Sequence, residues 1–299
     1  MSAGTPTAPE EMSSRQALRS LPWTALIWFA LLLIACYGPV LYRLAGQWAH
    51  DDDMGHGFFV PLVAGYIAWQ RRRELLETVP APSWWGLLIL AWGAAQLYVA
   101  TLGAELFLQR TAFIVSLVGV VLLLGGRPIL RILAFPLFLL CFMVPIPAIV
   151  YNQVTFRLQL LASSIAEATL SLLGVPVLRE GNILELASQR LSVVEACSGI
   201  RSLLTLSFLS LVYAYLFDKK VWMRWVLLLA AVPIALIANS SRVTITGLLG
   251  EVNPELAEGV FHAASGWVIF MVGLALLMLT HFLVNRVYHF VCARKREAV

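Results

Sequence analysis

Residues 21–41 read LPWTALIWFALLLIACYGPVL, a continuous apolar run without a single charged side chain. A helix needs about 20 apolar residues to cross the ~30 Å hydrocarbon core of a bilayer, so this stretch predicts a membrane-spanning helix. The whole chain has the same character, because 60% of its 299 residues are hydrophobic, only 13% are charged, and the mean hydropathy is +0.82. Soluble domains carry about 25% charged residues, so this composition excludes a soluble enzyme and a disordered scaffold.

Two other global features also exclude common classes. The net charge of +4 could indicate nucleic-acid binding, but the basic residues lie between apolar runs, which argues against it. The four cysteines are far apart and form no Cys-x-x-Cys pair, so neither a zinc site nor a disulfide framework is indicated. The sequence predicts no metal and no cofactor.

Apolar runs follow one another almost without a break, which predicts an all-α polytopic integral membrane protein with about eight transmembrane helices. We expect residues 1–20 to form a disordered cytoplasmic tail, residues 21–291 a single transmembrane domain, and residues 292–299 a basic cytoplasmic tail. The expected spans are Leu21–Leu44, Gly57–Gln70, Trp84–Leu102, Thr111–Gly125, Ile129–Val150, Gly199–Phe217, Trp222–Leu249 and His262–His289.

Charge predicts the topology, because positive residues stay in the cytoplasm. Eight spans with both termini inside place every basic cluster on the inner side, provided that Val154–Leu173 does not cross. That segment carries polar residues among leucines and is predicted to be an amphipathic helix lying on the membrane. The clusters are Arg71–Arg73, Arg127 with Arg131, Lys219–Lys220 with Arg224, and Arg294–Arg296, whereas outer loops carry Asp51–Asp53 and Glu251.

The segment between Val175 and Cys197 mixes apolar and polar residues in rough alternation. Val177–Leu186 and Arg190–Val194 are separated by Ala187–Ser188–Gln189, which predicts a small β-hairpin exposed on the periplasmic face.

Cys197 lies in Glu195-Ala-Cys-Ser-Gly-Ile-Arg201, where the hairpin turns into an apolar helix. The free amides of a helix N-terminus carry partial positive charge, which lowers the pKa of a thiol and can stabilise an oxyanion. The alternative is a small buried apolar residue, which is the interpretation we give to Cys36 and Cys141 within their spans.

Arg242 lies in an otherwise apolar helix, in the outer leaflet. An arginine within a span costs about 2.5–3.5 kcal/mol on insertion scales and by default marks a function. The alternative is a side chain that reaches the outer headgroups, with Asn239 as its structural partner.

His262 opens the last span, with Gly266 one turn later. A lone histidine at a membrane border is often only a polar border residue. A thiol, an imidazole and a guanidinium on three consecutive spans, however, are the parts of a cysteine acyl-transfer site. The spacing is compatible with their convergence at the outer face.

The motifs Glu-Ala-Cys-Ser-Gly-Ile-Arg, Asn-x-x-Arg-Val and His-x-x-x-Gly on the last three spans resemble those of the exosortases, bacterial membrane proteins of the exosortase/archaeosortase group. Gly55-His-Gly-Phe-Phe-Val-Pro61 resembles that family's Ser-His-Gly segment, with Gly55 in place of the usual serine. The resemblance implies Cys197 as nucleophile, Arg242 as oxyanion-holding or orienting cation, and His262 as base. It also implies the substrate, an exported protein ending in a Pro-Glu-Pro (PEP-CTERM) motif, a hydrophobic helix and a basic end.

Two further residues have open roles. His56, with His50 and Asp51–Asp53, could form an outer metal site, but capping the short second span or shaping the cleft is favoured. Arg201 could hold a substrate carboxylate, or it could pair with Glu195.

The sequence therefore predicts a membrane-embedded cysteine transpeptidase or protease that cleaves a C-terminal sorting signal through a thioester. Its partners would be exported proteins and the lipid bilayer, without nucleic acid. It would lie in the bacterial inner membrane with the site facing the periplasm. The alternatives are a transporter, or a polysaccharide-linked acyltransferase, that uses Arg242 and His262 to bind substrate.

Overall fold

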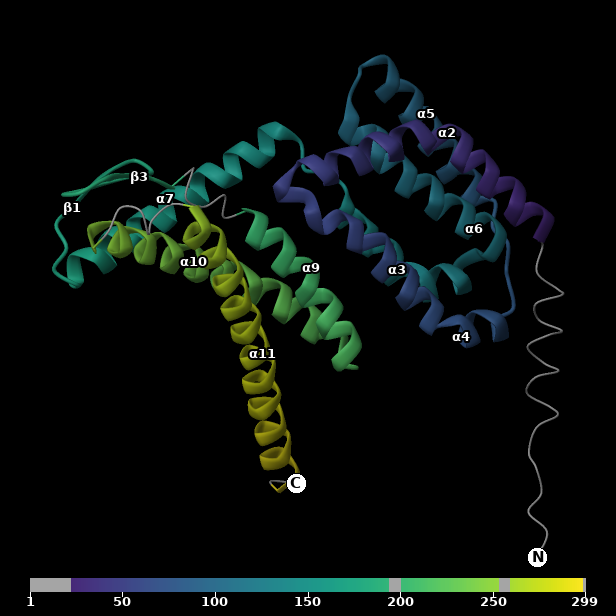
Figure 1. Cartoon of the computed structure of the whole chain (residues 1–299). Helices are drawn as coiled ribbons and strands as arrows, with labels where there is room; N and C mark the ends of the chain where they lie inside the picture. Colours follow the sequence, from purple (N-terminus) through teal and green to yellow (C-terminus); the bar gives the residue numbers. More distant parts are fainter. Residues whose placement is uncertain (1–22, 194–199, 253–258, 298–299) are drawn as a thin grey trace, which may run out of the picture. The chain divides into compact units, whose positions relative to one another are not determined.

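The computed structural model describes residues 23–193, 200–252 and 259–297. The chain divides into two compact units, one ending at Ile146 and the other beginning at Pro147 (Figure 1). Each unit is described by itself below. The predicted division into one membrane domain with two terminal tails stays a prediction.

The first unit is helical throughout its described part. Tyr37 on α2 is buried, and its hydroxyl lies 2.7 Å from Ser116 Oγ and donates to the Ala112 carbonyl of α6 at 3.1 Å. This contact holds α2 against α6. The surroundings are apolar, and burying an unpaired hydroxyl group there would cost free energy. The elements are α2 (Trp23–His50), η1 (Asp52–Phe58), α3 (Phe59–Gln70), α4 (Arg72–Glu77), α5 (Trp85–Leu102), α6 (Leu106–Leu139) and η2 (Leu140–Met143).

Helix α6 bends at Gly126, which leaves the helical conformation at φ +72°. A side chain at this position would overlap the Ala81 carbonyl, and the Ala81 amide donates to Gly125 O at 3.1 Å. Glycine is therefore required both for the positive φ and for the close approach. The expected spans Thr111–Gly125 and Ile129–Val150 largely correspond to the two helical stretches that Gly126 separates.

The expected number of eight spans is wrong. Six helices among the described residues are long and apolar enough to cross a membrane. Two differences account for this number. Leu106–Met143, which is interrupted at Gly126, is one of the six, and α3, with 12 residues, extends only about 18 Å. The six are Thr24–His50, Trp85–Leu102, Leu106–Met143, Ile200–Phe217, Val221–Glu251 and Gly266–Cys292. The fold class, an all-α polytopic membrane protein with a small sheet, is confirmed.

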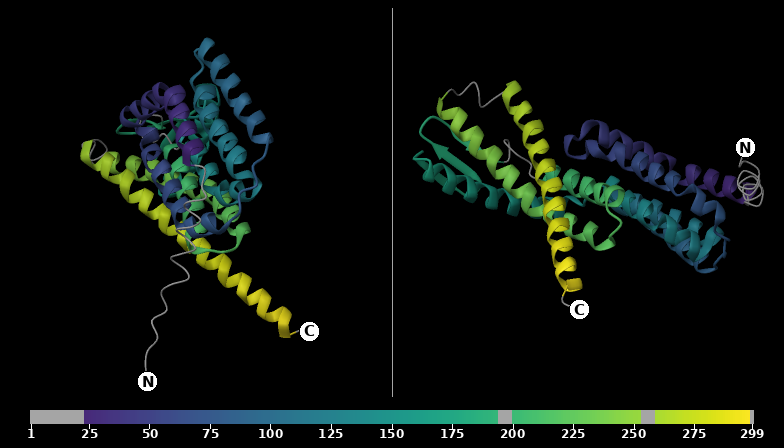
Figure 2. Two further views of the ribbon diagram at one scale, coloured as in Figure 1. Left: turned by 90° about the vertical axis from the view of Figure 1, so that its right-hand side faces the viewer. Right: turned by 90° about the horizontal axis from the view of Figure 1, so that it is seen from below.

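In its described part, the second unit combines four helices with one small sheet. Its helices are α7 (Ala148–Leu172), α9 (Ile200–Phe217), α10 (Val221–Val252) and α11 (Gly259–Glu297). Helix α11 runs as one long helix in both views of Figure 2. The strands are β1 (Val177–Glu180), β2 (Ile183–Leu186) and β3 (Arg190–Ser192), antiparallel in the order β1-β2-β3.

The expected hairpin is thus a three-stranded meander, because Val177–Leu186 itself folds back. Gly181 has φ +66° and, with Asn182, forms a two-residue turn that pairs Glu180 with Ile183. A Gly-Asn pair is a hairpin signal because a positive φ matches the strand twist there. The Gly181-Asn182 pair lies inside the range Val177–Leu186 and was therefore the available signal for this turn.

The polar residues of α7 hold the sheet. Gln159 Oε1 accepts from Asn182 Nδ2 at 3.1 Å, and Ser163 Oγ donates to Gly181 O at 3.1 Å. Glu167 pairs with Arg179 at 2.7 Å. These residues recur at four-residue intervals and so lie on one helix face. The polar pattern that predicted a helix lying on the membrane therefore reflects, at these three positions, docking of the β1–β2 hairpin.

Candidate active site at the outer ends of α10 and α11

Arg242 lies half-buried on α10, and its guanidinium lies against Gly266 of α11. A Cβ atom on residue 266 would stand 3.5 Å from each of Arg242 Cζ, Nη1 and Nη2. His262 lies four residues before Gly266 in the same helix. Residues four apart share one helix face, so the backbone places His262 on the face that Arg242 contacts. The contact between Arg242 and Gly266 is what the structure describes here, and the catalytic role of Arg242 and His262 stays a prediction.

The sheet leads the chain toward the same helix. Val193, directly after β3, is fully buried in one apolar cluster with Val243, the neighbour of Arg242. The Val193 amide also donates to Asn182 O at 3.0 Å, which fixes the end of the strand. Cys197 follows four residues later. Cys197 and Glu195 themselves lie outside the described residues.

A clasp joins the β2–β3 turn to the end of α10. Ser188 donates to Glu251 Oε1 from its backbone amide at 3.1 Å and from its hydroxyl at 2.8 Å. The hydroxyl also lies 3.3 Å from the Gly250 carbonyl. Because β3 continues toward Cys197, this clasp holds the approach to the cysteine segment against the helix that carries Arg242.

Two of the other predicted site residues also belong to this unit. Asn239, only 6% exposed, lies one turn before Arg242 on α10. Arg201 is exposed in the first turn of α9. The predicted choice between a substrate-holding Arg201 and a pair with Glu195 stays open, since Glu195 is outside the described residues.

His56 belongs to the first unit, within η1. Burial lowers the pKa of this imidazole, although contacts with the backbone of Phe142 and Asp53 act in the opposite direction. The following Gly57 is packed so closely that a Cβ there would fall on the Trp48 indole, whose Nε1 donates to Met143 O at 3.0 Å. The glycine at position 57 is therefore explained by close packing of η1 against the α2 and η2 segments.

His50 and Asp51, considered above for an outer metal site, both make hydrogen bonds within the protein. His50 Nδ1 lies 2.7 Å from the Gly46 carbonyl of its own helix, and Asp51 Oδ1 accepts from the Asp53 amide at 3.0 Å. Among the described residues, no group of three or more histidine, cysteine or acidic side chains is arranged to hold a metal ion.

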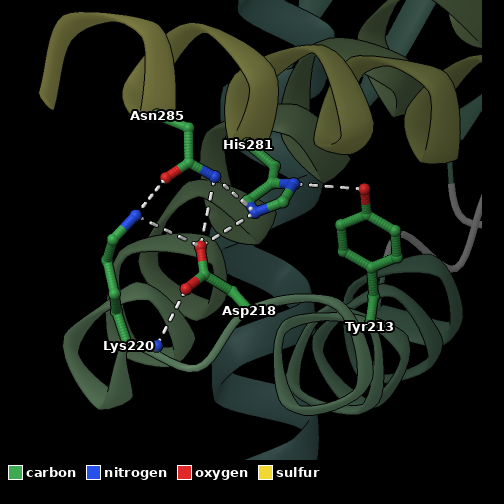
Figure 3. A network of polar contacts seen from close by, with 5 residues as sticks. All are labelled: Tyr213, Asp218, Lys220, His281 and Asn285. Carbon is green, nitrogen blue, oxygen red and sulfur yellow. Dashed lines mark hydrogen bonds and ion pairs between the residues drawn. The ribbon is translucent and has the colours of Figure 1, made fainter. Parts of the chain in front are cut away.

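A polar network at the α9–α10 turn was not foreseen from the sequence. Asp218 lies at its centre, with Oδ2 3.1 Å from His281 Nε2 and 3.1 Å from Asn285 Nδ2, both on α11 (Figure 3). Asn285 Oδ1 accepts from Lys220 Nζ at 2.6 Å, and Tyr213 OH lies 3.1 Å from His281 Nδ1. His281 and Asn285, four residues apart, were the available signal, because such a polar pair within an apolar helix needs partners.

Asp218 carries the charge of this network. Burial by itself raises the pKa of this carboxyl. Hydrogen bonds from the Lys220 amide, Asn285 and His281, together with the Lys220 charge, outweigh burial and hold the pKa below its ordinary value. Asp218 is thus ionised at neutral pH and fastens α11 to the turn between α9 and α10.

These observations define a polytopic helical membrane protein in which an intramembrane arginine contacts the start of the last helix, with a small sheet docked nearby on the same helix. A family model described as transmembrane exosortase (Exosortase_EpsH) matches residues 48–279, more than three quarters of the chain. The chain therefore belongs to the transmembrane exosortase family, which confirms the resemblance seen in its motifs and makes it, in general terms, a membrane sorting transpeptidase. No curated protein and no solved structure matches it.

Proposed function

We propose that this exosortase is a cysteine transpeptidase or protease that removes the C-terminal sorting tail of exported proteins, here called clients. The tail would comprise a Pro-Glu-Pro motif, a hydrophobic helix and a basic end. The site would face the periplasm and both chain termini the cytoplasm, which places the basic clusters Lys219–Lys220 and Arg294–Arg296 on the inner side. A site within the membrane suits such a client, because docking in the bilayer plane provides proximity.

The proposed reaction has two steps. His262 takes the Cys197 proton, and the thiolate attacks the scissile carbonyl carbon to form a carbon–sulfur bond and a tetrahedral oxyanion. The carbon–nitrogen bond then breaks, and the tail leaves as an amine with the proton returned by His262. The remaining thioester is attacked by an acceptor amine or by water, which releases Cys197.

Arg242 is assigned to the oxyanion. Its planar guanidinium presents several N–H donors that would stabilise the negative oxygen more strongly than the neutral carbonyl of the ground state. The observation that carries the proposal is the contact between this guanidinium and Gly266, on the helix face shared with His262. The packing of Val193 beside Val243 supports the approach of the Cys197 segment to the same place.

The test is coexpression with a client that carries the tail, followed by mass spectrometry of the client. The wild type is expected to yield a client shortened at the Pro-Glu-Pro motif, and Cys197→Ala to leave it intact while still inserting in the membrane. Cys36→Ala is the matched control, because this exposed cysteine lies in the first span. Tail removal by Cys197→Ala at the wild-type rate would overturn the cysteine mechanism.

A further inference from the structure

Strand β3 is an edge strand of the small sheet, and its register shows which of its backbone groups are paired. The Gln189 carbonyl and the Val193 amide, which flank β3, form hydrogen bonds of 2.9 and 3.0 Å with β2 and with the β1–β2 turn. Paired and outward-facing residues alternate along an antiparallel strand, so the N–H and C=O groups of Arg190 and Ser192 point away from β2. These outward groups form no hydrogen bond with another described residue, and β3 therefore has an open edge.

This open edge lies on the side of the sheet that is farther from α7. Helix α7 is bonded to β1 and to the β1–β2 turn, whereas the β2–β3 turn is bonded to the end of α10. Leu191 of β3 packs in the same apolar cluster as Val243, the neighbour of Arg242. A strand added to this edge would lie about 4.8 Å from β3, and so close to the helix that carries Arg242.

We propose that the open edge of β3 binds the Pro-Glu-Pro segment of the client as an added β-strand. The inference rests on the proposed function and identifies how the motif of the client is bound. In β-strand addition, main-chain hydrogen bonds supply the affinity, and side chains at alternate positions supply the specificity.

The spacing of the two prolines fits an edge strand. Proline has no N–H group and is tolerated in a sheet only where its nitrogen faces away from the ladder. In an extended chain, the N–H and C=O groups of one residue point to one side, and those of both neighbours point to the other. The client's glutamate therefore bonds to the main chain at Arg190 and Ser192, while both prolines face away. Because the prolines offer no donors on the outer side, a second client does not add to the first.

Charge on β3 complements the client's glutamate. The Arg190 side chain is 62% exposed, and its Nε atom lies 3.3 Å from the Glu185 carboxylate on β2. A guanidinium carries five N–H donors, so Arg190 has donors left for a second carboxylate on the side of the open edge. Pairs of opposite charge on neighbouring strands stabilise a sheet, and this pair would favour glutamate between the two prolines.

The first experiment changes only the client, so that folding of the protein is unaffected. Cys197→Ala protein in nanodiscs is titrated with a fluorescent synthetic peptide containing Pro-Glu-Pro, an apolar helix of about 20 residues and a basic end. N-methylation of the glutamate removes its N–H group and is expected to weaken binding about twofold to tenfold, the range for one net hydrogen bond. N-methylation two residues before the first proline, where the N–H group faces away from β3, is the matched control. Equal effects of the two N-methyl groups would overturn the proposal.

The second experiment changes the protein. Ser192→Pro removes an outward N–H group and leaves the hydrogen bonds between β2 and β3 in place, so binding should again weaken about twofold to tenfold. Ser192→Ala keeps the N–H group and is the matched control. A proline variant that is folded, as judged by its thermal midpoint, and binds as tightly as the alanine variant would contradict the added strand.

Charge recognition is tested by changing both partners. Arg190→Gln should weaken binding of the Pro-Glu-Pro peptide up to about fivefold at low salt, the upper range for an exposed ion pair. The same variant should bind a Pro-Gln-Pro peptide as the parent does, because no charge is left to lose. Equal losses with both peptides would show that the glutamate does not lie at Arg190.

Cross-linking locates the peptide directly. Facing residues of neighbouring strands have Cβ atoms about 4.5–5.5 Å apart, which is close enough for a disulfide after small adjustments. In a background lacking the native cysteines, Arg190→Cys is expected to cross-link to a peptide with cysteine in place of the glutamate. Leu178→Cys, 60% exposed on the opposite edge strand β1, is the control. Equal cross-linking at both edges would overturn the assignment to β3.

Failure of this inference differs from failure of the proposed function. A peptide that binds and is indifferent to N-methylation, to Ser192→Pro and to the position of the cysteine removes the added strand and leaves the transpeptidase intact. Absence of any binding, together with unprocessed clients in cells, removes both.

Discussion

The guanidinium of Arg242 lies flat against Gly266, with its carbon and both terminal nitrogens equidistant, at 3.5 Å, from the place of a missing Cβ. This distance is ordinary van der Waals contact, so a glycine at this position leaves room for the whole planar group beside α11. The contact joins the glycine of the His-x-x-x-Gly sequence on α11 to the arginine of α10. The distance also determines how large a side chain position 266 can accept.

Substitutions at Gly266 should be graded by size. Gly266→Ala adds a methyl group at contact distance and should retain activity close to the wild type. Gly266→Leu should displace the guanidinium and lower the rate of tail removal about 10²–10³-fold, the cost of losing an oxyanion donor. Val268→Leu, half a turn further along α11 at a position that is 61% exposed, is the control. A processing rate for Gly266→Leu equal to that of the control would show that Arg242 does not act from this position.

Arg242→Lys should lose most of the activity. Lysine keeps the charge but lacks the planar fork that can bridge two oxygens, and its ammonium does not reproduce the contact with Gly266. The expected fall in the rate of tail removal is again about 10²–10³-fold, measured by mass spectrometry of the client over time. A lysine variant as fast as the wild type would mean that only the positive charge is needed.

His262→Ala should change the pH dependence of the reaction. Without the base, tail removal should be slow at neutral pH and should partly recover as the pH rises toward about 8.5, where a free thiol ionises by itself. The measurement is the rate of processing in detergent between pH 6 and 9, with His289→Ala, near the other end of α11, as control. A pH profile identical to that of the wild type would assign His262 to packing.

Asp218→Asn should destabilise the protein without touching the candidate site. Removing the central charge leaves Lys220 without its ion-pair partner and weakens the hydrogen bond that Asn285 donates to residue 218. The free energy of unfolding should fall by about 3 kcal/mol. The thermal midpoint in detergent should fall, whereas Glu185→Gln, which breaks the exposed pair with Arg190, should leave it nearly unchanged.

The same carboxyl gives a pH prediction. The pKa of Asp218 in the folded protein is below its ordinary value of 3.8, so the unfolded chain takes up a proton first as the pH falls. The stabilisation is therefore complete well above pH 4 and is lost as the pH falls through the lower native pKa. Asp218→Asn should lack this part of the acid sensitivity. A wild type and variant that lose stability in parallel below pH 4 would contradict the assignment.

Topology can be tested with the four cysteines. A charged maleimide added to intact spheroplasts should label Cys197 alone, because Cys36 and Cys141 lie within candidate spans and Cys292 lies beside the predicted cytoplasmic cluster Arg294–Arg296. Cys292 should become reactive after permeabilisation. Labelling of Cys197 only after permeabilisation would place the site on the cytoplasmic side.

Local composition was sufficient to predict most of the helices, because a long uncharged run has few alternatives in a bilayer. Local composition failed where the structure depended on contacts with backbone groups far away in the sequence. The break in α6 at Gly126 lies against Ala81, whose carbonyl leaves no room for a side chain there. The polar face of α7 had two explanations, a membrane surface or a docked sheet, and only the positions of Asn182 and Gly181 distinguish them.

The sequence by itself determined that the chain is a helical membrane protein, which motifs it carries, and that Arg242 needs a functional reason to lie within a span. These properties follow from the solvent, since a bilayer excludes charge and requires every backbone group to be satisfied within a helix. Only the tertiary structure decided that Arg242 meets Gly266 and that Val193 packs beside Val243. Such contacts join residues tens of positions apart, and their geometry depends on how helices α7, α9, α10 and α11 pack, which no local pattern specifies.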